Sequence, residues 1–293
     1  MYFCTLSETK QLNYIIMKKL FLTILTVALS FGLATAQDIA QITETYNNGA
    51  NALGAGNKVE ALNYFQTALK QAAALGEDGA EIANNCKTAI PNVALSIAKD
   101  LIKAADYDNA VVKLNEAVAI AKELNAESAV AEATKLIPQV LTQKGNALLK
   151  DKNFEGAAAA FKSILDADPA NGVAAFRLGQ SLSSLGKSDE AVAAFLQAAE
   201  NGQKDNAFKQ LSTLYLKDAS NALKNKDFKG AMEGAIKSTE YVESANAFKI
   251  AGTAATSLGD KAKAVEYLSK YLELSPSAAD AAQIKTAIEA LKK

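Results

Sequence analysis

The 293-residue sequence contains no histidine and no tryptophan, and it has only two cysteines. Without histidine, neither a Ser-His nor a Cys-His nucleophile pair can form, and no imidazole is present to hold a metal ion or transfer protons. Two cysteines are also too few for a thiolate zinc site. We therefore predict that the protein is not an enzyme, and that it has no catalytic residue, no metal site and no cofactor.

An excess of charge of either sign is missing as well. Lysine and arginine total 31 residues and aspartate and glutamate 32, which gives a formal net charge of −1. Nucleic acids and anionic lipid surfaces attract proteins with a basic excess, so neither is an expected partner. The carboxylate pair Asp106 and Asp108 lies at a predicted helix start, where capping explains it. Gly54 and Gly56 follow a predicted helix and not a strand, which excludes a dinucleotide-binding loop.

The amino end has the layout of a secretory signal peptide. Lys18 and Lys19 provide a positive start, Leu20–Leu33 is apolar, and Ala34–Ala36 places small residues on both sides of a threonine. A charged start, an apolar stretch and a small-x-small site are the three parts of such a peptide. We therefore predict a signal peptide over 17–36.

Residues 1–16 have no place in a signal peptide, so the true start is predicted at Met17, with cleavage before Gln37. The mature chain, 37–293, is then exported to the periplasm or secreted, and it contacts a membrane only if the signal peptide stays uncleaved. Cys86 becomes its only cysteine. No intramolecular disulfide is therefore expected.

A small residue followed twelve positions later by an alanine occurs six times along the chain. The pairs are Gly49 and Ala61, Ala98 and Ala110, Gly145 and Ala157, Gly179 and Ala191, Ala219 and Ala231, and Gly252 and Ala264. Four positions after the alanine, five units carry a large apolar residue: Phe65, Leu114, Phe161, Phe195 and Leu268. A small residue lets two helices approach closely, and a large one fills the adjoining hollow. Fixed offsets of this kind predict a solenoid whose units pack on their neighbours.

These offsets resemble those of the tetratricopeptide repeat family, which has a glycine in its first helix, an A-x-x-x-F signature in its second and a closing proline. Residues 172–205 fit best, with Gly179, Ala191 and Phe195. The resemblance implies an all-α, right-handed superhelical solenoid of about six helix-turn-helix units with a carboxy-terminal capping helix. The units are predicted near 42–75, 91–124, 138–171, 172–205, 212–245 and 245–278, and the cap at 279–292.

The first two intervals between units are longer than the family's repeat, and their extra residues keep helical spacing. Apolar residues three and four apart continue through Pro91 and again through Pro138, in two segments that look alike. Such spacing indicates one buried helical stripe. We therefore expect long, bent first helices in units two and three.

Members of the family commonly bind an extended peptide or a partner helix on the concave surface lined by their first helices. Carried across unit by unit, this groove consists of Gln139, Thr142, Asn146, Phe176, Gln180, Thr213, Leu216, Lys249 and Thr253. Most of these residues are neutral and polar, which suits hydrogen bonds to a peptide backbone or to sugar hydroxyls and does not favour a charge clamp. Two alternatives stay open: the face is merely solvated, or Phe176 packs between first helices.

Two classes of function fit this sequence. The first is a non-catalytic protein–protein interaction scaffold of the bacterial cell envelope that binds a partner peptide or helix in the groove. The second is an envelope ligand-binding or sensory module for a glycan or peptide. We favour the scaffold.

Overall fold

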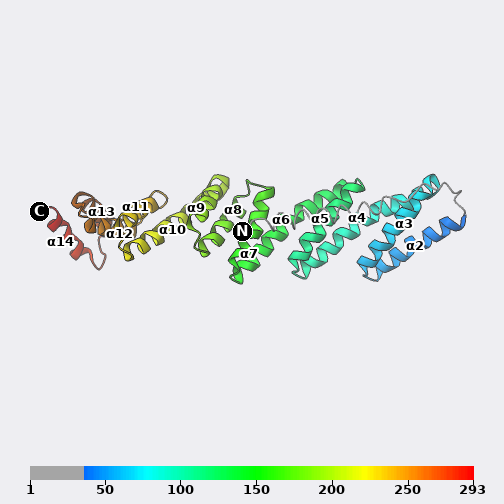
Figure 1. Cartoon of the computed structure of the whole chain (residues 1–293), viewed down its shortest axis with the longest axis horizontal. Coiled ribbons are helices and arrows are strands. Elements are labelled where there is room, and N and C mark those ends of the chain that lie inside the picture. The colour runs from blue at the N-terminus through cyan, green and yellow to red at the C-terminus, as the bar shows by residue number, and fades with distance from the viewer. Residues whose placement is uncertain (1–35) are drawn as a thin grey trace, which may run out of the picture. The chain divides into compact units, whose positions relative to one another are not determined.

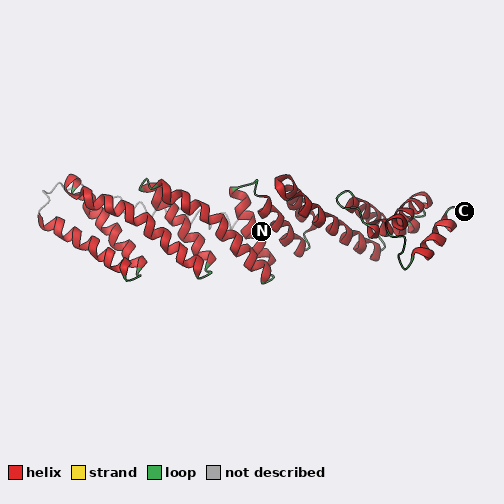
Figure 2. Cartoon of the chain, turned by 180° about the vertical axis from the view of Figure 1, so that it is seen from behind, coloured by secondary structure: helices red, strands yellow, loops and turns green. Residues whose placement is uncertain are grey.

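The computed structural model describes residues 36–293, and no strand occurs among them (Figures 1 and 2). Its helices are α2 (Ala36–Gly54), α3 (Lys58–Ala74), η1 (Gly76–Gly79), α4 (Ala80–Lys103), α5 (Tyr107–Glu123), α6 (Glu127–Lys150), α7 (Phe154–Ala167), α8 (Gly172–Ser184), α9 (Ser188–Ala198), η2 (Ala199–Gln203), α10 (Lys204–Lys224), α11 (Phe228–Thr239), α12 (Ala245–Ser257), α13 (Lys261–Leu274) and α14 (Ala281–Leu291). The predicted all-α solenoid of helical repeats is confirmed. The predicted start at Met17, residues 1–16 before it and nearly all of the signal peptide predicted over 17–36 lie outside the described residues.

The chain forms two compact units. One runs to Asp100 and includes Lys113–Ala133, and the other comprises Leu101–Val112 and Thr134–Lys293. The residues predicted to bind a partner all belong to the second unit. Within the described residues, no helix combines the length and apolar character needed to cross a membrane.

Each repeated glycine lies against the large residue of the same repeat. A Cβ atom built on Gly145 would lie 2.5 Å from Cζ of Phe161, and one built on Gly179 would lie 2.7 Å from Cδ1 of Phe195. The corresponding distance is 2.9 Å from Gly49 to Cε1 of Phe65 and 2.7 Å from Gly252 to Cδ2 of Leu268. Because carbon atoms in contact normally stay about 3.5–4.0 Å apart, these glycines leave the space that the rings and the leucine occupy.

The alanine twelve positions after each of these glycines lies near the start of the second helix of its repeat. The four alanines are Ala61 of α3, Ala157 of α7, Ala191 of α9 and Ala264 of α13. All four have an exposed fraction of 0%. The N–H of each donates to the carbonyl oxygen four residues earlier, over 2.9–3.0 Å, which is the bond that begins a helix. A small side chain at this buried position lets the second helix approach its neighbours closely.

The large residues of the repeats form the core of each of the two compact units. In the first unit, Phe65 is buried with Ile90 and Cys86, and the rings of Phe65 and Tyr46 have centroids 5.2 Å apart. In the second unit, Phe161, Phe195 and Leu211 belong to one continuous buried cluster. Burial of such side chains removes apolar surface from water, which supplies most of the stability of the helix pairs.

Short turns join the two helices of a pair. The side chains of Asn153, Asp227 and Asp260 accept a hydrogen bond from the backbone N–H three residues later, over 2.9–3.1 Å. Each side chain thereby satisfies one of the free N–H groups at a helix start. Gly186 and Gly259 adopt φ angles of 74° and 76°, a left-handed conformation that glycine reaches without a Cβ clash.

Two first helices are long, as their apolar spacing predicts. Helix α4 is unbroken across Pro91 and α6 is unbroken across Pro138, and each contains 24 residues. By comparison, α8 and α12 contain 13 residues each. Pro91 is buried, so its ring replaces an aliphatic side chain in the core. The extra length therefore belongs to the helices themselves and not to loops.

The segment predicted as a cap contains α14. This helix packs on α13 and buries Ala281 and Ile288, while Gln283, Lys285 and Glu289 are exposed. A terminal helix with one apolar and one polar side closes the apolar end of a solenoid against water.

Candidate functional site

The candidate site is the exposed side of the first helices in the second unit. Helix α10 contacts both α8 and α12, and Leu141, Leu148 and Leu149 of α6 pack on the same core as α8. These helices therefore present their exposed residues on neighbouring surfaces. We call this surface the first-helix face and define it by the exposed or half-exposed residues of α6 from Thr134 onward and of α8, α10 and α12.

On α6, the predicted residues Gln139 and Asn146 are exposed, and Thr142 is half-buried. The hydroxyl of Thr142 donates a hydrogen bond to the carbonyl oxygen of Pro138 over 2.7 Å. The two amides offer donors and acceptors to the solvent side, so this part of the face suits a neutral polar partner.

The two residues predicted on α8 are half-buried and engaged within the helix or its core. The Phe176 ring lies against the Phe195 ring, with centroids 5.7 Å apart and planes inclined by 56°. The side-chain amide oxygen of Gln180 accepts a hydrogen bond from the guanidinium of Arg177 over 3.0 Å. Phe176 therefore contributes to packing, and only part of its ring is accessible to a partner.

On α10 and α12, the predicted residues Thr213 and Thr253 are exposed, and Leu216 is half-buried. The Thr213 and Thr253 hydroxyls each donate to a carbonyl oxygen one turn earlier, over 2.8 Å. Since a hydroxyl oxygen also accepts, both can still receive a hydrogen bond from a ligand.

The predicted residue Lys249 has partners within the protein. Its ammonium nitrogen lies 2.6 Å from Oδ2 of Asp280 and 5.6 Å from the centre of the Tyr271 ring, and the Tyr271 hydroxyl donates to Oδ1 of Asp280. Hydrogen bonds from Lys249 and Tyr271 hold the pKa of Asp280 below its usual value, and the bond to Asp280 raises the pKa of Lys249. The ion pair between Lys249 and Asp280 thus links α12 to the start of α14.

Sequence reasoning missed two lysines on the same face. Lys209 and Lys217 are exposed on α10, one turn before and one turn after Thr213. The signal was present in the sequence, because a spacing of four residues places all three side chains on one side of a helix. Neither lysine forms an ion pair with any residue that the structure describes.

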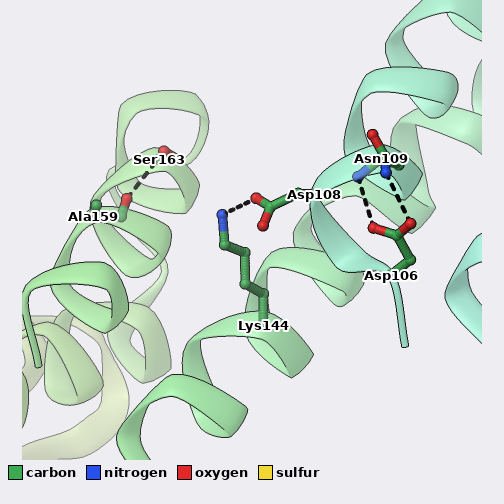
Figure 3. Close-up of polar contacts among 6 residues, drawn as sticks. All are labelled: Asp106, Asp108, Asn109, Lys144, Ala159 and Ser163. Carbon is green, nitrogen blue, oxygen red and sulfur yellow. Dashed lines mark hydrogen bonds and ion pairs between the residues drawn. The ribbon is translucent and has the colours of Figure 1, made fainter. Parts of the chain in front are cut away.

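The polar groups considered for chemistry have structural partners. Asp106 accepts hydrogen bonds from the backbone and side-chain nitrogens of Asn109, and Asp108 forms an ion pair with Lys144 (Figure 3). Figure 3 also shows the Ser163 hydroxyl donating to its own helix. Among residues 36–293, no group of three or more Cys, Asp or Glu side chains is arranged to hold a metal ion.

Cys86 is fully buried, and this burial raises the pKa of its thiol to about 11. The thiol therefore stays protonated near neutral pH, whereas nucleophilic attack and metal binding both need the thiolate. Its role is that of a small apolar side chain in the core.

Two sequence models described as tetratricopeptide repeat match the chain, one over residues 148–215 and one over residues 250–277. The first range extends from the end of α6 into α10, and the second covers most of α12 and α13. The chain therefore carries tetratricopeptide repeats over these two ranges. Tetratricopeptide repeats generally act as non-catalytic interaction modules, so its architecture is that of a protein-interaction scaffold.

Three solved structures illustrate the similarity to known tetratricopeptide proteins. MamA is 20% identical, with a TM-score of 0.37, and the match covers 53% of this chain and 82% of MamA. PilW, described as a widely conserved type IV pilus biogenesis factor, is 18% identical, with a TM-score of 0.34 and coverage of 67% and 98%. YrrB, described as a tetratricopeptide protein with an unusual peptide-binding site, is 20% identical, with a TM-score of 0.35 and coverage of 66% and 91%. No curated protein matches the sequence.

Proposed function

We propose that this protein is a non-catalytic scaffold of the bacterial cell envelope that binds a peptide or helix of a partner protein on the first-helix face. The observation that carries the proposal is the exposure of neutral amide and hydroxyl side chains on this face, at Gln139, Asn146, Thr213 and Thr253. The signal peptide predicted over 17–36 supports the envelope location.

The chemistry of the face suits a protein backbone. An extended peptide presents N–H and C=O groups along its length, and each exposed amide of Gln139 and Asn146 can both donate and accept. The hydroxyl oxygens of Thr213 and Thr253 add two acceptors on neighbouring helices. A first helix of a repeat thereby supplies hydrogen-bonding positions at regular intervals.

The test introduces large side chains on the first-helix face and leaves the rest of the surface unchanged. In one variant, Thr213→Trp and Thr253→Trp place large, uncharged side chains on the exposed sides of α10 and α12. In the matched control, Ser163→Trp and Ala193→Trp do the same on α7 and α9, which are second helices of their pairs. All four positions are exposed, so both variants are expected to fold.

Tagged mature protein and both variants are returned to the native host, and proteins retained from the envelope fraction are quantified. We expect wild type and control to retain the same partner in stoichiometric amounts and the first-helix variant to lose it. Equal retention by all three proteins would contradict the proposal. Binding to a glycan array without a protein partner would favour the ligand-binding module instead.

A further inference from the structure

The first and second helices of the second unit differ in charge. Helices α8, α10 and α12 together carry six basic and two acidic residues, for a net charge of +4. Helices α9, α11 and α13 carry five of each sign and have no net charge. The basic excess of the second unit's repeats therefore lies on the helices that form the first-helix face.

The second helices also neutralise many of their charges locally. Ion pairs three or four residues apart join Lys229 to Glu233 and Lys270 to Glu273, at 3.9 and 3.0 Å. On the first helices, Arg177 is hydrogen-bonded to Gln180 and Lys249 is paired with Asp280. Arg177 and Lys249 therefore already have polar partners within the protein.

Among α8, α10 and α12, the unpaired positive charge is concentrated on α10. Lys209, Lys217 and Lys224 are exposed, and no carboxylate of residues 36–293 lies within ion-pair distance of them. The two acidic residues of α10 lie elsewhere: Asp205 is in its first turn, and Asp218 is half-buried about 100° around the helix from Lys217. These lysines form no ion pair within the described residues, so their ammonium groups can pair with carboxylates of a ligand.

Resting on the proposed function, we infer that the partner is an acidic segment, bound in extended form along α10 with its carboxylates on Lys209 and Lys217. Eight residues of helix separate these lysines, which corresponds to about 12 Å at roughly 1.5 Å per residue. Four residues of extended chain span about 13 Å and return to the same side of the chain. Acidic side chains at positions i and i+4 of an extended segment therefore match the two ammonium groups.

A protein segment fits this surface better than a phosphate polymer does. Thr213 lies between the two lysines, with Asn206 and Asn221 on the same exposed stripe, and these neutral groups pair with peptide N–H and C=O groups. Planar recognition of phosphate favours arginine, and the single arginine, Arg177, is already bonded to Gln180.

The test uses a fluorescein-labelled decaglutamate peptide as the probe and fluorescence anisotropy as the readout. The affinities of the mature wild-type chain and of a Lys209→Gln, Lys217→Gln double variant are compared. The matched control is Lys162→Gln with Lys261→Gln, which removes two exposed lysines from the second helices α7 and α13. Circular dichroism melting shows whether all three proteins fold.

We expect the double variant to bind decaglutamate about three- to tenfold more weakly than wild type, the size expected for two exposed ion pairs. The control keeps its affinity, and binding of wild type weakens as salt rises from low to physiological strength because the charges are exposed. Equal losses in variant and control would overturn the assignment to α10. So would decathymidylate or phosphatidylglycerol vesicles binding more tightly than decaglutamate.

The outcome is separable from that of the proposed function. If Thr213→Trp with Thr253→Trp abolishes capture of a protein partner but decaglutamate does not bind, the scaffold stands and the acidic partner is wrong. If the first-helix variant still retains the protein partner and decaglutamate does not bind the wild-type chain, both proposals fail.

Discussion

At the scale of single residues, close packing matters more than charge for the stability of the repeats. Lys144 and Gly145 are neighbours on α6 and show the two effects side by side. Lys144 pairs with Asp108, whose side chain is 79% exposed (Figure 3), and Gly145 leaves room for the Phe161 ring. Exposed ion pairs contribute about 0–1 kcal/mol, whereas forcing an extra atom into a packed core costs about 1–3 kcal/mol.

We predict that Gly145→Ala lowers the free energy of unfolding by about 1–3 kcal/mol, because its new Cβ would meet the buried Phe161 ring at 2.5 Å. Lys144→Ala should cost under about 1 kcal/mol. Urea unfolding followed by circular dichroism measures both. If Lys144→Ala lowered the free energy of unfolding more than Gly145→Ala does, the claim that packing outweighs exposed ion pairs would be contradicted.

Phe176 is the second test at this scale. Its ring packs on Phe195 but keeps an accessible part, so Phe176→Ala should destabilise the protein by about 2 kcal/mol, less than the roughly 3–5 kcal/mol of a fully buried phenylalanine. Thermal melting and partner capture, carried out on the same variant, separate its two roles. An unchanged melting temperature with lost capture would show that the ring is an exposed anchor and not a packing residue.

At the scale of elements, the capping helix α14 is fastened by one charged group. Asp280 immediately precedes this helix and receives bonds from Lys249 on α12 and Tyr271 on α13. The three groups connect three helices, so the contact is not local in sequence. We expect the stability of the carboxy-terminal end to depend on the ionised state of this carboxyl.

The sign of the pH effect follows from the pKa shift. The pKa of Asp280 is lower in the folded than in the unfolded state, so its stabilisation is complete above the ordinary aspartate value of about 3.9 and is lost as the pH falls through the folded value. Asp280→Asn should therefore lower the melting temperature near neutral pH, and the difference from wild type should shrink in acid. Glu289→Gln is the control, because Glu289 pairs with Lys292, which directly follows α14, and this contact joins no second helix. A difference that grows in acid would contradict the role of Asp280.

Sequence alone predicted the elements whose cause is local. The spacing of apolar residues indicated the long helices across Pro91 and Pro138, and the small-to-large offset placed Gly179 opposite Phe195, because both patterns arise within one helix pair. By contrast, the partner of Lys249 comes from a segment 31 residues later, which no local pattern encodes. The site was therefore less predictable than the fold.

The irregular segment η2 between α9 and α10 also escaped prediction. Gly202 there has a φ angle of 86°, and the carbonyl oxygen of Asn201 approaches Gly172 so closely that a Cβ at this position would lie 2.0 Å away. Nearby, the Gln197 amide donates to the carbonyl oxygen of Pro169 over 2.8 Å. These contacts join segments nearly 30 residues apart, so only the folded arrangement shows why Gly172 has no side chain.

At the scale of the whole molecule, the proposed envelope location rests on the signal peptide predicted over 17–36. We predict that the mature chain begins at Gln37, because the charged, apolar and small-residue parts of a signal peptide end at Ala36. Amino-terminal sequencing of the protein from its native host gives the answer. A mature chain that retains Leu20–Leu33 would replace the exported scaffold by a membrane-tethered one.

The central claim is that the first helices, and not the second helices, meet the partner. In-cell photo-crosslinking tests it most directly, with a benzoylphenylalanine placed singly at Asn146 or Thr213 on the first-helix face, or at Ser163 or Ala193 on second helices. The account predicts one common protein adduct from Asn146 and Thr213 and none from Ser163 and Ala193. Adducts of equal yield from all four positions, or from the second-helix positions alone, would contradict it.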